Sequence, residues 1–229
     1  MKTVNAVKYF AGTALAVAIS SAAVAEPTRG FTIEHGTVAE KGAVSIDVSN
    51  NLRTTTAGVR AGFGKAELVL NSGLLGSATS TDGIVKIALP AFDGLSELNH
   101  SWAVFGGLSM YDDEVTDYMN FSAGVAFTAA VDSLSFTVTP ALVVDDAKDE
   151  TYLTIGAGAY FSFGETDYGT FQPGVEIGIS TLDGADTMVN LGVRWGLNDR
   201  VTLDLVPLQL GGATDVVSIP GQFRVNASF

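Results

Sequence analysis

Apolar residues alternate with small or polar residues over long stretches of the chain. The clearest stretch runs from Tyr118 to Val131, where the odd positions from Met119 onward are apolar and the even positions are Asn, Ser, Gly, Ala or Thr. Successive side chains of a β-strand point to opposite faces, so strict alternation predicts a strand. The same pattern recurs at 134–142, 153–163 and 189–196. Beyond the first 25 residues, no run approaches the ~20 consecutive apolar residues of a membrane-spanning helix.

The composition of the two strand faces distinguishes a membrane barrel from a soluble sandwich. In a sandwich one face packs large residues, and the other is solvated and rich in Lys, Glu and Thr. Here the second face consists mostly of Gly, Ala, Ser and Thr, with an occasional charge. The stretch from Tyr118 to Val131 also exceeds the ~9 to 11 residues that a tilted membrane-spanning strand needs. The pattern predicts an all-β fold, a transmembrane antiparallel up-and-down β-barrel with its large residues toward lipid. A soluble periplasmic β-sandwich remains the alternative.

Turn positions divide the chain into about twelve predicted strands, and an even number is what a bacterial barrel with both termini in the periplasm requires. Ten strands are the alternative, because Gly and Thr blur the edges of the early strands. With this orientation the short connections fall in the periplasm and the longer ones outside, except for a long connection at 90–99. We expect the barrel to span 43–229, with strands at Ala43–Ser49, Thr54–Phe63, Lys65–Asn71, Gly83–Leu89, His100–Tyr111, Tyr118–Val131, Ser133–Val143, Thr151–Phe163, Thr170–Ser180, Met188–Leu197, Arg200–Leu208 and Gln222–Phe229.

The first 25 residues have the order of parts of a secretory signal peptide. Met1 to Lys8 carries two lysines and no acid, Tyr9 to Ile19 is apolar, and 23–25 read Ala-Val-Ala, the small residues that precede a cleavage site. We predict a signal peptide at 1–25, a cut after Ala25, and a periplasmic lead-in or plug at 26–42. The alternative is a buried N-terminal helix.

Composition excludes several classes of function. A formal net charge of -13 disfavours a nucleic-acid partner, and the absence of cysteine removes disulfides and Cys-based zinc sites. The chain has two histidines and no Gly-x-Ser-x-Gly elbow. His35 precedes the first predicted strand, and His100 lies at the inner end of its strand. We therefore expect no enzymatic activity, no cofactor and no metal site.

The last residues alternate and end in phenylalanine. Phe223, Val225, Ala227 and Phe229 occupy the odd positions, and polar residues occupy the even ones. This terminus resembles the signal strand of Gram-negative outer-membrane β-barrel proteins, a porin-like class, although no specific family within it is indicated. The resemblance implies location in the cell outer membrane. It also implies recognition by the barrel assembly machinery and periplasmic chaperones, and contact with outer-membrane lipid and lipopolysaccharide.

Charged residues on the inward parity are the candidates for a pore lining. One interpretation is a small porin-like channel for passive diffusion of small solutes or ions, in which facing charges select what passes. The other is a non-conducting structural or surface-interaction barrel whose lumenal ion pairs close a packed interior. A count of twelve strands does not distinguish the two interpretations, because barrels of about 8 strands are filled by side chains and barrels of about 16 strands leave a channel. The candidates are Asp47, Arg60, Lys65, Glu67, Lys86, Glu176, Arg194, Asp204 and Arg224.

Residues expected in the outer loops are strongly acidic, with Lys148 as the only base. They would bind divalent cations that bridge lipopolysaccharide, repel anionic solutes, or form a solvated rim. The acids are Asp82, Asp112, Asp113, Glu114, Asp117, Asp145, Asp146, Asp149, Glu150, Asp183, Asp186 and Asp215. Six aromatic residues near strand ends are expected to form a girdle at the membrane interface, namely Trp102, Tyr111, Tyr118, Tyr152, Tyr168 and Trp195.

Overall fold

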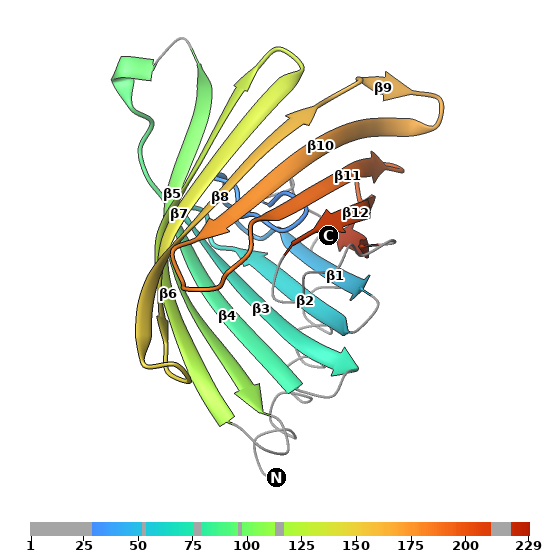
Figure 1. Cartoon of the computed structure of the whole chain (residues 1–229). Helices are drawn as coiled ribbons and strands as arrows, with labels where there is room; N and C mark the ends of the chain where they lie inside the picture. The colour runs from blue at the N-terminus through green and yellow to red at the C-terminus, as the bar shows by residue number, and fades with distance from the viewer. Residues whose placement is uncertain (1–28, 52–53, 76–78, 96–97, 113–116, 212–220) are drawn as a thin grey trace.

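The computed structural model describes residues 29–51, 54–75, 79–95, 98–112, 117–211 and 221–229. Its long strands form a closed antiparallel barrel (Figure 1). They are β1 (Val44–Asn51), β2 (Thr55–Gly62), β3 (Ala66–Leu75), β4 (Thr79–Ala88), β5 (Asn99–Asp112), β6 (Asp117–Val131), β7 (Leu134–Asp145), β8 (Glu150–Phe161), β10 (Gly169–Ser180), β11 (Met188–Gly196), β12 (Val201–Leu210) and β13 (Gln222–Ser228).

Each strand pairs with its neighbour in sequence, and β13 pairs with β1 to close the ring. The two-residue strand β9 (Glu165–Thr166) pairs only with β10 and extends one hairpin beyond the barrel. The described residues therefore form a barrel of twelve strands, as the sequence predicted, rather than the alternative ten. No helix in the described residues has the length and apolarity needed to cross a membrane.

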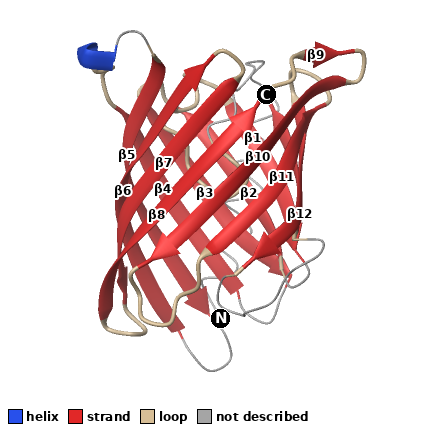
Figure 2. Ribbon diagram, turned by 45° about the horizontal axis from the view of Figure 1, so that its top comes forward, coloured by secondary structure: helices blue, strands red, loops and turns tan. Residues whose placement is uncertain are grey.

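The two ends of the barrel differ. We call the end where β1 begins and β13 finishes the terminal end; there the Val44 amide donates to the Phe229 carbonyl over 3.2 Å. We call the opposite end the loop end. The connection at 132–133 is a two-residue turn at the terminal end, with Asp132 at φ 51°. The long connection at 89–98 also lies at the terminal end, and Figure 2 shows its 3-10 turn η1 (Asp93–Leu95) and β9 at the same end of the barrel as the C-terminus.

The outer surface of the barrel is apolar and the inner surface is small or polar, as the alternation predicts. Outward residues such as Phe121 and Leu142 are 50% and 56% exposed. Such exposure of large apolar side chains around a closed sheet fits lipid as the surrounding solvent. Inward positions include Ala103, Ala126 and Thr137, which are almost completely buried.

Three of the six residues expected in the aromatic girdle face the lumen instead. Tyr111 and Tyr118 share the inward parity of Ala103 and Ala126 on unbroken registers, and Tyr152 shares that of Tyr160. Nearness to a strand end does not fix the side of the sheet, whereas parity does. Trp102 and Trp195 have outward parity, and their indole N–H groups donate to the carbonyls of Pro90 and Tyr168 at 2.6 and 2.7 Å.

Candidate functional site

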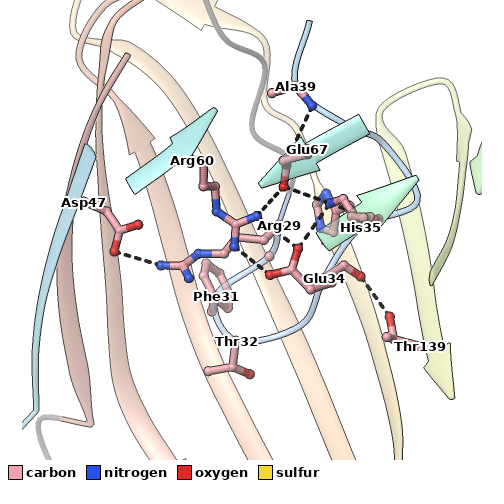
Figure 3. A network of polar contacts seen from close by, with 12 residues as sticks. Arg29, Phe31, Thr32, Glu34, His35, Ala39, Asp47, Arg60, Glu67 and Thr139 are labelled. Atoms are coloured by element: carbon pink, nitrogen blue, oxygen red, sulfur yellow. Dashed lines mark hydrogen bonds and ion pairs between the residues drawn. The ribbon is translucent and has the colours of Figure 1, made fainter. Parts of the chain in front are cut away.

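Residues 29–41, which precede β1, lie inside the ring of strands (Figures 1 and 3). We call residues 29–41 the lumen segment. It contains a tight turn in which the Gly30 amide donates to the Ile33 carbonyl over 2.8 Å, and Arg29 bridges to Glu34. Phe31 and Ile33 are buried. A Cβ atom on Gly30 would collide with the Tyr160 hydroxyl and the Glu176 carboxylate, so a larger residue here would have to displace both groups.

Glu176 on β10 anchors the turn. Its side chain is 0% exposed and accepts hydrogen bonds from the amides of Phe31 and Thr32 at 2.5 and 2.9 Å. The hydroxyls of Thr32 and Tyr160 donate to the same carboxylate, each over 2.5 Å. A buried carboxylate is costly unless such donors surround it, and here four donors do so. The contact joins residues 145 positions apart in sequence.

A second set of contacts fixes Glu34 and the residues after it (Figure 3). Arg60 of β2 contacts Glu34 at 2.6 Å and Glu67 of β3 at 2.8 Å. Lys86 of β4 contacts the same two carboxylates at 3.1 and 3.3 Å. Glu67 also accepts from the Ala39 amide at 2.7 Å, and the Thr139 hydroxyl donates to the Glu34 carbonyl at 2.8 Å.

A third set lies on β11, β12 and β13. Arg194 binds Asp204 through two nitrogens, at 2.7 and 2.9 Å, and Arg224 binds it at 3.1 Å. The same arginines hold the backbone of the lumen segment. Arg194 donates to the carbonyls of Arg29 and Gly30 at 3.1 and 3.2 Å, and Arg224 donates to those of Gly30 and Phe31.

The structure brings eight of the nine pore-lining candidates together and leaves one outside. Lys65 lies in the turn between β2 and β3 and is exposed. The eight others are buried and contact the lumen segment directly or through one another; they are Asp47, Arg60, Glu67, Lys86, Glu176, Arg194, Asp204 and Arg224. Arg60 pairs with Glu67, and Arg194 and Arg224 pair with Asp204, whereas Glu176 receives backbone amides and hydroxyls.

Sequence reasoning missed the side chains that the lumen segment itself contributes. Arg29 pairs with Asp47 of β1 at 3.0 Å, and Glu34 receives Arg60 and Lys86. With them the described network holds five basic and five acidic side chains, so it is electrically balanced. The available signal was one acid and one base flanking Phe31 and Ile33 in a stretch without strand alternation.

The lumen segment leaves space at the terminal end of the barrel. A cavity of about 830 Å³ lies between the segment and the inward ends of β1, β10, β11, β12 and β13. The charged part of its wall consists of five arginines, Arg29, Arg60, Arg194, Arg200 and Arg224, and three acids, Glu165, Asp167 and Asp199. His35 adds no charge to the segment, because burial and nearby Arg194 lower the pKa of its imidazole to about 3.

The acids expected in the outer loops differ in where the structure places them. Asp146, Asp149, Asp183 and Asp186 are exposed in loop-end connections. The assignment of Asp82 and Asp145 to outer loops was wrong, because they lie within β4 and β7 on the inward parity. Their strands run further than the alternation showed, since Thr, Ser and Gly mark strand ends poorly. Asp112, Asp117 and Glu150 are the loop-end residues of β5, β6 and β8. Asp113, Glu114 and Asp215 lie outside the described residues.

The described residues contain no group of His, Cys, Asp and Glu side chains suited to hold a metal ion. The C-terminal residues that suggested an assembly signal face outward on β13. Phe223 is 42% exposed, and Val225 and Ala227 share its parity. Phe229 follows at the terminal end, where its amide donates to the Val44 carbonyl at 2.8 Å.

Comparison with known proteins gives a fold and no family. No protein-family model and no curated protein sequence matches the chain. A structure titled KdgM porin in complex with disordered oligogalacturonate matches with a TM-score of 0.55 at 11% identity, over 82% of this chain and 98% of that one. A NanC porin matches with a TM-score of 0.49 at 12% identity, over 82% and 98%. A BenF-like porin from Pseudomonas fluorescens Pf-5 matches with a TM-score of 0.39 at 12% identity, over 77% and 55%. The chain has the barrel fold of the first of these porins.

Proposed function

We propose that the protein is a porin-like outer-membrane channel for passive diffusion of small polar solutes or ions. The observation that carries this proposal is the cavity of about 830 Å³ inside a barrel whose inner wall bears charged side chains. A membrane barrel with an apolar exterior gains nothing from charges inside unless they serve the lumen or one another. The porin fold supports the same conclusion.

In this proposal the lumen segment is the constriction. It crosses the lumen between Asp47 on β1, Glu176 on β10 and Lys86 on β4, so that solutes must pass beside it. Twelve strands enclose more space than side chains alone fill, and the segment occupies part of it. Facing positive and negative groups at such a constriction orient and select small solutes.

A non-conducting barrel is the second candidate, and the ion pairing favours it. Asp47, Arg60, Glu67, Lys86, Arg194, Asp204 and Arg224 all form ion pairs within the network. Paired and buried charges are what a closed, structural lumen would contain. In that case the exposed acids at the loop end would carry the function through surface interactions.

The proposal includes the route to the membrane. Residues 1–25 would be removed as a signal peptide, leaving residues 26–42 as an N-terminal unit that enters the barrel. The terminal strand would be recognised by the assembly machinery and periplasmic chaperones. Lipid and lipopolysaccharide would contact the apolar exterior.

Single-channel recording of the refolded chain from residue 26 in a planar bilayer tests the channel. We expect discrete conductance steps whose ion selectivity shifts in Arg194→Ala, which removes a cavity-lining charge, and in Glu176→Ala, which releases the segment. Lys65→Ala is the matched control, because this charge lies in an exposed turn outside the network and should leave selectivity unchanged. Heat-modifiable migration in detergent verifies folding of each variant. Silent bilayers with folded, inserted protein would refute the channel in favour of the second candidate.

A further inference from the structure

Three tyrosines and two aspartates line one arc of the inner wall at the loop end. We call Asp82, Tyr111, Tyr118, Asp145 and Tyr152 the loop-end cluster. They come from the five consecutive strands β4 to β8, and each has inward parity on an unbroken register. The cluster lies on a different part of the lumen from the ion-pair network, and the proposed constriction does not use it.

The tyrosine rings lie together beside the carboxylates. The rings of Tyr111 and Tyr118 stack with centroids 4.6 Å apart, and both are half-buried. Asp82 lies two residues from Ser80, the cross-strand partner of Tyr111. Asp145 lies two residues from Val143, the cross-strand partner of Tyr152. The rings and the carboxylates thus lie side by side on one arc of the inner wall near the loop end.

Neither carboxylate is neutralised within the described residues. Asp82 receives the hydroxyl of Ser109, and Asp145 receives the backbone amide of Lys148 and lies 3.3 Å from the side-chain amide of Asn120. No ion pair in the described part of the chain includes either aspartate, whereas nine of the ten charged residues of the lumen network form ion pairs. Two carboxylates that form no ion pair among the described residues therefore lie next to aromatic rings.

This combination favours one class of ligand. A cation over the face of an aromatic ring is attracted by the ring quadrupole, and groups of aromatic residues recognise quaternary ammonium ligands in this way. Nearby carboxylates and the acidic rim would raise the local concentration of cations at the entrance. A metal ion fits less well, because the described residues hold no metal-binding group and the ring faces offer no oxygen ligands.

We propose that the loop-end cluster is a binding site for small organic cations that carry an ammonium or quaternary ammonium group. Such a cation would stack on the Tyr111 and Tyr152 rings, with Asp82 and Asp145 balancing its charge. This inference names the class of solute that binds at the loop end of the channel. The role of the site in transport rests on the proposed function.

The test is calorimetric titration of the refolded, detergent-solubilised protein with choline and with 3,3-dimethyl-1-butanol, its uncharged isostere. We expect choline to bind and the isostere to bind at least tenfold more weakly. Tyr111→Leu should weaken choline binding by about threefold to thirtyfold, the range of one cation–π contact. Tyr111→Phe should retain binding because it keeps the ring. Asp145→Asn should weaken binding and reduce the preference for choline over the isostere.

Tyr168→Leu is the matched control, since this tyrosine is 77% exposed on the hairpin at the opposite end of the barrel. Equal affinity for choline and its isostere, or equal weakening in Tyr168→Leu and Tyr111→Leu, would overturn the inference. Binding of glucose as tight as that of choline would overturn it too. Because the titration needs no conduction, its failure is distinct from that of the channel: a conducting protein without choline preference refutes only the cation site, and a silent protein that binds choline refutes only the channel.

Discussion

Glu176→Gln should release the lumen segment from the barrel wall. The carboxylate accepts two backbone amides and two hydroxyls, and it is fully buried. An amide side chain replaces one acceptor oxygen by a donor, so either the Phe31 or the Thr32 N–H loses its partner, whereas the hydroxyls can rotate. Hydrogen bonds to charged groups contribute about 1.5 to 3 kcal/mol and an unsatisfied buried donor costs about 1 to 3 kcal/mol. We expect the docked segment to lose about 2 to 4 kcal/mol.

Hydrogen exchange of the peptide that covers the lumen segment measures this loss. At 1.4 kcal/mol per factor of ten, exchange in Glu176→Gln should be roughly 30-fold to 700-fold faster than in the wild type, provided that it proceeds through local opening. Exchange in β5 and β6, which do not contact Glu176, should not change. Glu165→Gln, at an exposed position on β9, is the control. Unchanged protection of the segment in Glu176→Gln would refute the inference that this carboxylate anchors it.

Three further predictions concern packing, pH and the lipid-facing surface. Phe31→Ala should accelerate exchange in the segment as though about 3 kcal/mol were lost, because it empties a buried site, and unchanged exchange would argue against burial. Burial alone would raise the pKa of Glu34, but Arg60 and Lys86 hold it well below its ordinary value of 4.5. The stabilisation that Glu34 gives to the docked segment should therefore be complete above about pH 4.5 and fall as the pH drops further. Hydrogen exchange in the segment should accelerate accordingly in the wild type, and Glu34→Gln should lose the part of this pH dependence that is due to Glu34. Val138→Arg should lower the free energy of unfolding in lipid vesicles by about 2 to 4 kcal/mol relative to Val138→Ala if Val138 lies near the bilayer midplane, and no difference would contradict its lipid-facing assignment.

The alternation of side chains contained enough information for the barrel but not for its contents. Strands such as β6 were evident because apolar residues alternate strictly with small or polar residues over their whole length. The beginning of β4 was missed, since Thr79 to Gly83 has no apolar member. Inward parity identified Glu176 and Arg194 as lumen residues. It could not reveal that both would bind the segment around Gly30, because these contacts join parts of the chain more than 140 positions apart.

Parity placed side chains correctly within the regular strands, whereas nearness to a strand end did not. Tyr111 and Tyr118 were assigned to the lipid interface because they stand near strand ends, and their parity places them in the lumen. Lys65 was counted as inward although a turn residue has no place in the alternation. Both errors arise from using a rule outside the regular part of a strand.

A cross-linked variant tests most directly the claim that solutes pass through a lumen shared with residues 29–41. The chain has no cysteine, so Thr32→Cys with Asn190→Cys introduces a single pair. The Thr32 Oγ1 and Asn190 Nδ2 atoms at these positions lie 3.1 Å apart. We predict that this disulfide forms on oxidation of the folded protein and that the cross-linked protein conducts with the same single-channel steps before and after reduction. Failure of the pair to oxidise, or loss of conductance that reduction restores, would contradict the claim.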